Sequence, residues 1–328
     1  MPPTPPPEAT DVFTHTRALI GGWSLPTTGD STPQSLVIEV LVGVPSETRS
    51  NSTFPLIIKG IRQRAEVEMR DRPEVGDIKI VVRYLAPELF KPESFGRRSP
   101  AGAGPGRGTI LIYPYDPAAV AAAAQRTKIV SVLESYRDLD VDFLDTDDAA
   151  GIDGLVARLH VAGHTRIGFA SWHYPVAGNW VARRFGGFVT ALKARGLRFE
   201  PTWALNVLPE ERSLSTDEVA ATAARHVRTS GVTAWVCAAD HQAYPLVRGL
   251  RTEGIRVPHD CSVTGFDGVE PPAGLPRVSS VRVNHEHIGS SALTRMVNRI
   301  IYPSSPQRKI IVPSQLVPGE TIAAPPLT

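Results

Sequence analysis

Residues 231–267 have the sequence GVTAWVCAADHQAYPLVRGLRTEGIRVPHDCSVTGFD, and this stretch decides the fold class. It contains an apolar run at Thr233–Ala238, an amphipathic helical pattern at Ala243–Glu253 and a second apolar run at Ser262–Phe266. Short continuous apolar runs are typical of strands that are buried on both faces of a sheet. Two such strands joined by a helix form a parallel pair, because parallel strands need a long crossover connection. The stretch therefore predicts an α/β fold.

The same alternation of strands and helices extends along most of the chain. Strands are expected at Leu36–Val44, Asp77–Tyr84, Thr109–Tyr113, Lys128–Leu133, Val141–Leu144, Arg166–Ser171, Trp203–Val207 and Ser279–Val283, with two short ones around Lys309–Val312 and Gln315–Val317. Helices are expected at Pro55–Met69, Pro117–Arg126, Ala150–Val161, Val181–Arg195, Thr216–Thr229 and Glu286–Ile301. About nine alternating strands are too many for one doubly wound sheet, and they divide near Gly163 into two halves. The sequence thus predicts an α/β protein with two Rossmann-like lobes, each with a parallel sheet, and a ligand cleft between them.

Composition and the N-terminal stretch narrow the class of protein. The chain has 328 residues, 42% hydrophobic residues and a formal charge of +2. That is enough apolar content for two domains and too little positive charge for a free-standing nucleic-acid-binding domain. Residues 1–35 are rich in Pro, Thr, Ser and Gly, and we expect them to form a disordered arm. They lack the basic start and apolar core of a secretory signal, and no apolar run in the chain is long enough to span a membrane. We therefore expect a cytoplasmic protein, with Cys237 and Cys261 as buried free thiols.

Polar side chains follow several of the expected strands. In doubly wound sheets, ligands bind at the carboxyl ends of the strands, so these side chains would line the cleft between the lobes. Carboxylates accept hydrogen bonds from hydroxyl groups, an arginine donates several, and an indole ring stacks on the apolar face of a sugar. The mixture favours a small polyhydroxy ligand. The candidate ligand-binding residues are Glu134, Trp172, Tyr174, Arg184, Asp240 and Asp267, with Asp145, Asp147, Asp148, His173 and Arg183 beside them.

Some of these candidates also have a purely structural interpretation. An acidic residue after a parallel strand often only caps the next helix, because its oxygen accepts from free backbone amides. For Asp240 both interpretations stay open. Trp172 and Tyr174 could equally be apolar residues that cover the interface between the lobes without contacting a ligand. His164, in the stretch AGHTRIGF, is expected to be a structural loop residue.

Several stretches resemble, in order and in spacing, the effector-sensing domain of the lactose-repressor/galactose-repressor (LacI/GalR) family. They are residues 163–169 (GHTRIGF), 184–188 (RFGGF) followed by Ala191 and Leu192, 238–240 (AAD), 254–267 (GIRVPHDCSVTGFD) and 317–321 (VPGET). The resemblance covers about residues 36–325. It is weaker before residue 108, where only the general strand–turn–helix pattern is kept.

The resemblance implies a periplasmic-binding-protein-like fold of type I, in which the chain crosses three times between the lobes. The first lobe would comprise residues 36–163 and 284–304, and the second residues 164–283 and 305–328. Effector contacts are implied at Arg184 and Asp267, and at the acid Glu134. Asp240 falls in the family's Asn-Asp pair, but its neighbour here is Ala239 in place of Asn, so one usual polar contact is missing.

The resemblance also implies the partners of such a regulator. These are a carbohydrate-like small-molecule effector, a second copy in a homodimer and operator DNA, with no membrane. The helix near Pro55–Met69 and surfaces near Glu270–Val283 would meet the second copy, while the helix at Glu286–Ile301 would pack within the first lobe.

The chain departs from the family in its first residues. Residues 1–35 show neither a trihelical pattern nor the hinge helix that reads DNA, so no DNA-reading element is seen. Three explanations are open: the DNA-binding part is lost, another chain supplies it, or the start is misplaced. Leu19–Asp30 is alternatively a remnant wing of an upstream domain.

Other function classes find weaker support in the sequence. An enzyme acting on sugars needs a paired acid and base or an activated nucleophile at one site, and no such motif stands out. The HEHIG stretch lacks the zinc-protease pattern, because Gly289 stands four positions after His285. The glycine-rich loop at 91–108 precedes a strand and does not open a helix, so we expect a flexible loop and not a phosphate site. We expect no catalytic residue, metal or cofactor. The prediction is an effector-sensing module; the alternatives are a transporter-associated solute-binding protein and a sensor that acts through a partner.

Overall fold

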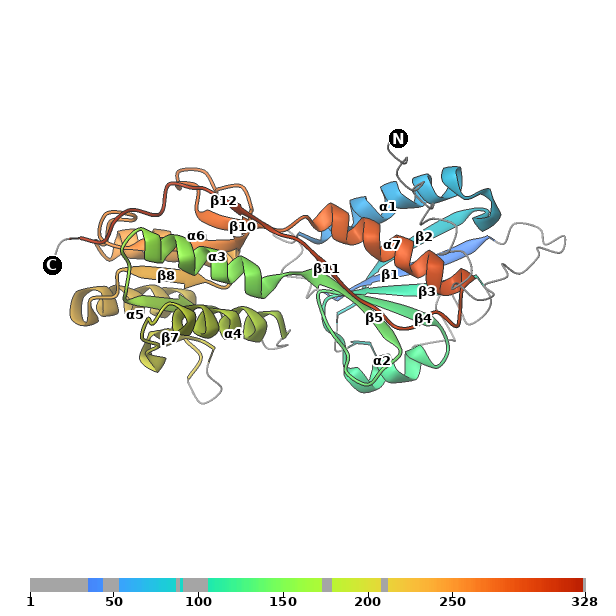
Figure 1. The fold of residues 1–328 in the computed structure, drawn as a ribbon, viewed down its shortest axis with the longest axis horizontal. Coiled ribbons are helices and arrows are strands. Elements are labelled where there is room, and N and C mark those ends of the chain that lie inside the picture. Colours follow the sequence, from blue (N-terminus) through green and yellow to red (C-terminus); the bar gives the residue numbers. More distant parts are fainter. Residues whose placement is uncertain are drawn as a thin grey trace, which may run out of the picture.

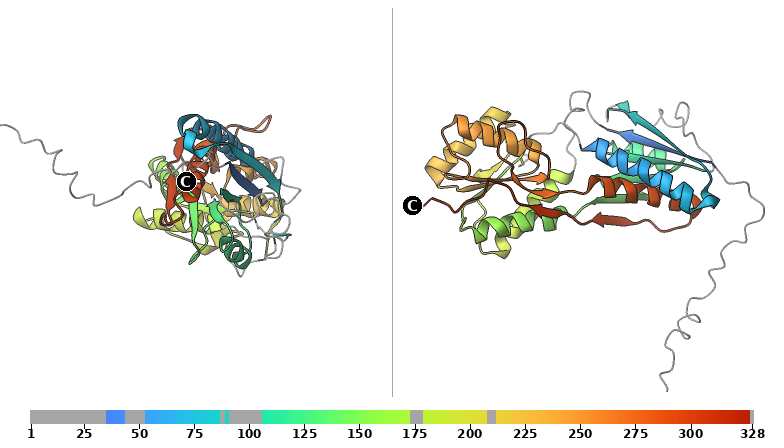
Figure 2. Two further views of the ribbon diagram at one scale, coloured as in Figure 1. Left: turned by 90° about the vertical axis from the view of Figure 1, so that its right-hand side faces the viewer. Right: turned by 90° about the horizontal axis from the view of Figure 1, so that it is seen from above.

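The chain folds into two lobes that lie end to end, each built around its own sheet (Figure 1). This computed structural model describes residues 35–43, 53–86, 89–90, 106–172, 179–207 and 212–326. The predicted arm at residues 1–35, apart from Ser35, and most of the glycine-rich loop at 91–108 lie outside the described residues. Viewed from above, the lobes occupy opposite ends of the long axis, with strands running between them (Figure 2).

The first lobe has a six-stranded sheet in the order β11-β5-β4-β3-β1-β2, and all its pairs are parallel. Its strands are β1 Leu36–Val42, β2 Ile78–Tyr84, β3 Arg107–Ile112, β4 Lys128–Val132, β5 Val141–Thr146 and β11 Lys309–Val312. Helices α1 Phe54–Asp71 and α7 His285–Ile301 cover one face, α2 Pro117–Ala124 covers the other, and the short 3₁₀ helix η2 spans Pro73–Val75.

The two faces of this sheet can be followed along a single strand. In β1, Ile38 and Val40 pack with α1 and α7, whereas Leu41 packs with α2. Successive side chains of a strand point to opposite faces, so a strand covered on both sides must be apolar throughout. This explains why the sequence of β1 is a continuous apolar run apart from Glu39, which is paired with Arg83 at 2.8 Å.

The second lobe has a six-stranded sheet in the order β12-β10-β9-β8-β6-β7, in which only the β10–β12 pair is antiparallel. Its strands are β6 Ile167–Ala170, β7 Ala204–Leu205, β8 Ala234–Cys237, β9 Ser262–Asp267, β10 Ser279–Arg282 and β12 Gln315–Val317. Helices α3 Asp148–Val161 and α4 Asn179–Ala194 cover one face, α5 Thr216–Ser230 and α6 Asp240–Thr252 the other, and the 3₁₀ helix η5 spans Pro201–Trp203.

Local signals in the sequence begin and end these helices. The side chain of Asp116 accepts from the backbone N–H of Ala119 and so caps α2. Ser215 and Glu218 form a reciprocal capping box at the start of α5, and Gly231, with a φ of 65°, ends that helix in the left-handed conformation. Within the described residues, no helix is long and apolar enough to cross a membrane.

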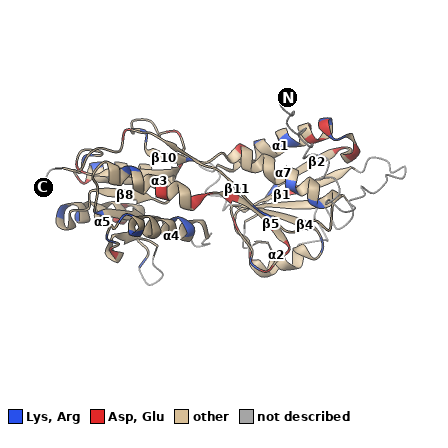
Figure 3. Cartoon of the chain, viewed as in Figure 1, with Lys and Arg blue, Asp and Glu red and all other residues tan. Residues whose placement is uncertain are grey.

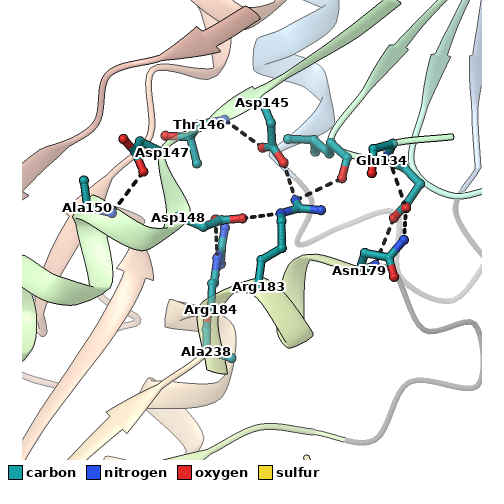
Figure 4. A network of polar contacts seen from close by, with 12 residues as sticks. Glu134, Asp145, Thr146, Asp147, Asp148, Ala150, Asn179, Arg183, Arg184 and Ala238 are labelled. Atoms are coloured by element: carbon teal, nitrogen blue, oxygen red, sulfur yellow. Dashed lines mark hydrogen bonds and ion pairs between the residues drawn. The ribbon is translucent and has the colours of Figure 1, made fainter. Parts of the chain in front are cut away.

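The predicted α/β class with two parallel-sheet lobes is confirmed, and the chain crosses between the lobes three times. It crosses from β5 to α3, from β10 to α7 and from β11 to β12. Because all three crossings lie together, the carboxyl ends of β4 and β5 in the first lobe come close to the amino ends of α3 and α4 in the second (Figure 4). This junction positions the candidate site.

Two boundaries of the predicted lobes differ from the structure. Helix α3 packs against α4 and β10 of the second lobe, so the first crossing lies at residues 146–148 and not near Gly163. Strand β11 pairs with β5, which places residues 309–312 in the first lobe and not the second. The reason is physical: an apolar periodicity reports which face of an element is buried, but not which sheet buries it. Helix α6 also begins at Asp240, three residues before the predicted start.

Candidate functional site

Arg184, on the second turn of α4, lies at the centre of the junction between the lobes (Figure 4). Its side chain is only 7% exposed. The Nε atom donates to Asp148 at 2.8 Å, Nη1 donates to the carbonyl of Ala238 at 2.7 Å, and Nη2 lies 3.5 Å from Asp267. A buried guanidinium is tolerated only when it is paired and hydrogen-bonded, and each of these nitrogens has an oxygen partner.

Two aromatic rings enclose the same guanidinium. Its central carbon lies 3.7 Å from the ring centroid of Phe266 and 4.8 Å from that of Trp180. Trp180 precedes Arg184 by one helical turn on α4, and Phe266 is the residue before Asp267 on β9. The arginine is therefore held in one position by carboxylates at its edge and by rings against its faces.

Asp267 ends β9 and has a φ of 109°, which is unusual for a residue with a side chain. Backbone conformations of this kind persist when the surroundings enforce them, and they cluster at functional sites. Burial raises the pKa of Asp267 to about 6, against the opposing effect of Arg184. The carboxylate is 14% exposed. It is thus the acid partner of Arg184 that retains access to solvent.

Glu134 follows β4 in the first lobe and reaches the start of α4 in the second. Its carboxylate accepts from the backbone N–H of Asn179 at 2.9 Å and from the side-chain amide of the same residue. The backbone N–H of Ser135 donates to it at 3.2 Å. A carboxylate at a helix N-terminus is stabilised by the unpaired N–H groups there. Glu134 therefore links the two lobes through the first residue of α4.

Arg183 forms a second link between the lobes and was not among the predicted ligand residues. It donates to Asp148 at 2.9 Å, to the first-lobe carbonyl of Leu133 at 3.4 Å, and to the carboxylate of Asp145 (Figure 4). Burial and the neighbouring Asp148 raise the pKa of Asp145 to about 7. The sequence signal that could have identified Arg183 as a site residue is its position directly before Arg184.

Asp240 lies in the second lobe with both carboxylate oxygens engaged. One accepts from the backbone N–H of Val269 at 2.7 Å, and the other accepts from the hydroxyl of Ser280 at 2.7 Å. The residue is fully buried, and burial raises its pKa to about 7. The N-cap of α6 is Ala239, without a side-chain capping bond, so Asp240 is not that helix's cap. Its carboxylate instead fixes the segment that follows Asp267.

The aromatic residues form a chain of ring contacts beside Arg184. The ring of Trp172 lies 5.1 Å from that of His241, which lies 6.4 Å from that of Trp180. The side chain of Trp180 also bonds to the phenol of Tyr113, whose pKa is raised by burial. Tyr113 directly follows β3, and Glu134 comes two residues after the end of β4. The rule that ligand-facing residues follow strands, which identified Glu134, would therefore also have identified Tyr113. Tyr174 and His173 lie outside the described residues.

We call Glu134, Trp172, Trp180, Arg184 and Asp267 the interlobe site. A cavity of about 300 Å³ opens beside it, lined by Phe143, Asp145, Asp148, Arg183 and Lys309 among others. Arg183 and Asp148 connect this cavity to Arg184. Among the described residues, no group of three or more His, Cys, Asp or Glu side chains is arranged to hold a metal ion.

Other residues singled out in the sequence have structural roles. The ring of His164 contacts Thr233 and Ser262, each at 2.9 Å, and the carbonyl of Ala323 at 2.9 Å, so it is the structural residue that was predicted. Cys237 and Cys261 are buried free thiols, as predicted.

Several known proteins are similar to this chain in sequence or in fold. Residues 156–322 match the family described as the periplasmic binding protein-like domain. The HTH-type transcriptional regulator MalR of Streptomyces coelicolor is 32% identical over 205 residues, which are 62% of this chain and 58% of the relative. The HTH-type transcriptional repressor PurR of Klebsiella pneumoniae is 24% identical over 214 residues, 60% of each chain. The chain thus spans little more than half the length of these curated relatives.

Solved structures extend the likeness to both lobes. A LacI family transcriptional regulator from Enterococcus faecium with bound ribose superposes with a TM-score of 0.67 at 18% identity, covering 88% of this chain and 99% of that one. The transcriptional regulator CelR in complex with cellobiose gives a TM-score of 0.69 at 19% identity, covering 88% and 86%. These relatives are regulators, in agreement with the expectation that the protein is not an enzyme. The chain belongs to the family of periplasmic binding protein-like domains, and its two-lobed fold is similar to that of the LacI family regulator structures.

Proposed function

We propose that this chain is the effector-sensing module of a LacI/GalR-like transcriptional regulator, which binds a small sugar-like ligand between its lobes. The observation that carries the proposal is the pairing of Arg184 with Asp267 at the junction of the lobes. The Arg184 guanidinium is a hydrogen-bond donor and the Asp267 carboxylate an acceptor, and the second lobe holds both in fixed positions. Together they suit a hydroxyl-bearing ligand, which needs donors and acceptors at defined positions.

The aromatic rings support the same ligand class. Trp172 and Trp180 offer flat apolar faces next to the polar pair, and sugars have apolar faces between their hydroxyl groups. Ribose and cellobiose are bound in two of the structurally similar regulators. In this proposal Arg184, Asp267, Trp172 and Tyr174 contact the ligand, Glu134 contacts it from the first lobe, and Asp240 acts indirectly by holding residues 268–269.

Coupling to DNA would arise from the contacts between the lobes. Helix α4 carries Arg184 and, on its first two turns, Asn179 and Arg183, which contact Glu134 and Asp145 of the first lobe. A ligand bound at Arg184 must therefore change or reinforce the lobe contacts. In a homodimer that presents its first lobes to operator DNA, such a change would alter DNA affinity, and DNA would alter effector affinity by the same factor. Helix α1 and the surface at residues 270–283 are the proposed contacts with the second copy.

Two alternatives make different predictions. A solute-binding protein that serves a transporter would bind the sugar as a monomer, because it has no need of a symmetric partner. A sensor that acts through a partner would bind the sugar as the regulator does and would show no affinity for DNA. Sedimentation of the chain with and without sugar separates the first alternative from the regulator, which should sediment as a dimer.

A thermal-shift screen against monosaccharides, disaccharides, sugar phosphates and nucleobases tests ligand binding. A ligand at 100 times its dissociation constant adds about 2.7 kcal/mol to the folded state. The shift should be lost in Asp267→Asn, which keeps the size of the side chain and removes its charge. Asp153→Asn is the matched control, because Asp153 pairs with Arg195 at the surface of α3 and α4. A screen without any shift, or a shift that survives in Asp267→Asn, would contradict the proposal.

A further inference from the structure

We propose that Asp148 is a positioning residue that couples effector binding at Arg184 to the lobe contact made by Arg183. The inference rests on the proposed function and names how that site is regulated. A contact between the lobes that never touches the ligand sets the affinity for it, and the ligand strengthens or weakens that contact in return. The observation that carries the inference is one carboxylate shared by two neighbouring arginines (Figure 4).

Asp148 divides its two carboxylate oxygens between the arginines. Oδ2 accepts from Nε of Arg183 at 2.9 Å, and Oδ1 accepts from Nε of Arg184 at 2.8 Å. Both bonds are charge-assisted, and the side chain of Asp148 is only 4% exposed, so little water is present to replace either partner. The two oxygens belong to one rigid planar group. A rotation of the carboxylate that follows one arginine therefore moves an oxygen away from the other.

Arg183 spans the point where the chain first crosses between the lobes. Its guanidinium pairs with Asp145, near the end of β5 in the first lobe, and with Asp148, the first residue of α3 in the second. It also donates to the first-lobe carbonyl of Leu133 at 3.4 Å, while its Nη1 atom is buried without a hydrogen-bond partner among the described residues. Its placement thus depends on acceptors from both lobes. When one lobe moves against the other, Asp145 moves relative to Asp148, and Arg183 must follow.

Arg184 carries the coupling into the proposed ligand site. The rings of Phe266 and Trp180 lie against its guanidinium, with centroids 3.7 Å and 4.8 Å from the central carbon, so they restrict its tilting. The motion that remains is a pivot in the plane of the group. Such a pivot changes the contact of Nη2 with Asp267, which is long at 3.5 Å, and the bond of Nε to Asp148 at the same time. A ligand that engages the Asp267 side therefore acts on Asp148.

The five groups form a series that alternates in sign from the first lobe to the second. In order they are Asp145, Arg183, Asp148, Arg184 and Asp267. Figure 3 shows acidic residues where α3 meets β11, at this crossing. In a region with little water, such a series is stable only when each charge keeps its neighbours, so a displacement at one end is felt along it. Ligand affinity and lobe contact then change by the same factor, as reciprocal coupling requires.

Isothermal titration of the full chain with ribose, glucose and cellobiose tests the coupling. In Arg183→Met, the dissociation constant of a sugar that binds should rise by at least about fivefold, although Arg183 is not a proposed ligand contact. In Asp148→Asn, the amide oxygen can accept from only one of the two arginines. Adding Arg183→Met to Asp148→Asn should therefore leave the dissociation constant unchanged within about twofold. A merely structural role for Asp148 would leave the fivefold effect in place.

Arg195→Met is the matched control. Arg195 also pairs with an acid of α3, Asp153, at 2.6 Å, but Asp153 is exposed and Arg195 contacts no first-lobe residue of the series. This variant should leave the dissociation constant unchanged. If a sugar binds to Arg183→Met as tightly as to the unmodified protein, or loses the same factor with Asp148→Asn already present, the inference is overturned and the proposed function stands.

A measurement without ligand separates the inference from the proposed function. Arg183 and Asp267 are not joined by an ion pair in the part of the chain that the structure describes. The shift in melting temperature of the double variant Arg183→Met, Asp267→Asn should nevertheless differ from the sum of the single shifts by about 2 °C or more. The difference should vanish when Asp148→Asn is also present. Additive shifts overturn the inference. If none of the three sugars binds, the proposed function loses its sugar ligand and this cycle decides the inference.

Discussion

Arg184 of α4 and Asp148 of α3 are joined at 2.8 Å, and both side chains are buried to more than nine-tenths. Asp148 is the first residue of α3, directly after the chain crosses between the lobes, and Arg184 lies on α4, which packs against α3. Among the described residues, Arg184 is the one ion-pair partner of Asp267, whereas Asp148 also pairs with Arg183, so removing Arg184 leaves the Asp267 carboxylate uncompensated in a region with little water.

Replacing Arg184 should strongly destabilise the protein. In Arg184→Met, the free energy of unfolding should fall by about 3–5 kcal/mol, because Asp148 and Asp267 lose their main counter-charge. Urea denaturation followed by circular dichroism measures the loss. The combined variant Arg184→Met, Asp148→Asn and Asp267→Asn should recover much of it, since no buried charge is then left unpaired.

A matched change directly after the same helix provides the comparison. Arg195 pairs with the exposed Asp153 at 2.6 Å, so Arg195→Ala should cost about 1 kcal/mol or less. If Arg184→Met were as mild as Arg195→Ala, the buried network would not hold the junction.

Arg183 should help to keep the lobes together in the absence of ligand. In Arg183→Ala, α4 loses its contacts with Asp145 and with the carbonyl of Leu133, both in the first lobe. The ligand-free protein should then show a larger radius of gyration by small-angle X-ray scattering, with unchanged helix content. Arg198→Ala removes a surface pair with Glu200 and should leave the radius as it is. Equal radii for Arg183→Ala and the unmodified protein would show that this contact does not restrain the lobes.

Asp240 should make stability depend on pH in a defined direction. Burial raises its folded-state pKa to about 7, whereas an unfolded aspartate has a pKa of about 3.9. Between these values the folded state holds more protons than the unfolded state, so this residue's contribution to the free energy of unfolding falls as the pH rises from about 4 to about 7. Asp240→Asn removes the effect and can still bond to Val269 and Ser280.

The measurement is the difference in melting temperature between Asp240→Asn and the unmodified protein at several pH values. The variant should gain relative to the unmodified protein as the pH rises from 5 to 8. His241 and His285 titrate in the opposite sense, but they are present in both proteins and largely cancel. A difference that does not change with pH would mean that Asp240 does not titrate in this range.

Helices α1 and α7 approach so closely that glycine is needed at their contact. A Cβ atom on Gly60 would lie 1.9 Å from the carbonyl oxygen of Glu286, and one on Gly289 would lie 2.0 Å from that of Ile57. Gly60→Ala and Gly289→Ala should therefore each lower the free energy of unfolding by about 1–3 kcal/mol through overpacking. Gly186→Ala on α4, where nothing lies within 4 Å, should instead be neutral or stabilising by up to about 1 kcal/mol. Urea denaturation of the three variants checks the contrast, and equal effects would contradict the packing argument.

The sequence by itself determined the type and order of the elements and the position of the main polar pair. Continuous apolar runs such as that of β8 identify strands covered on both faces, and their alternation with helices implies parallel sheets. Because ligand-facing groups follow such strands, Asp267 was identifiable from its place after the predicted strand Ser262–Phe266, at the end of β9. Arg184 was identifiable from its RFGGF stretch, through the resemblance to a known family.

Only the tertiary structure decided which sheet each element joins and how each acid is used. Helix α3 and strand β11 have the same periodicity in either lobe, so their assignment depends on which partner buries their apolar face. Asp240 and Asp267 both follow strands, yet Asp240 is bonded to Val269 and Ser280 while Asp267 faces Arg184. The difference arises because the direction of a side chain and its partners are set by distant segments brought together in folding, and a local pattern holds no information about them.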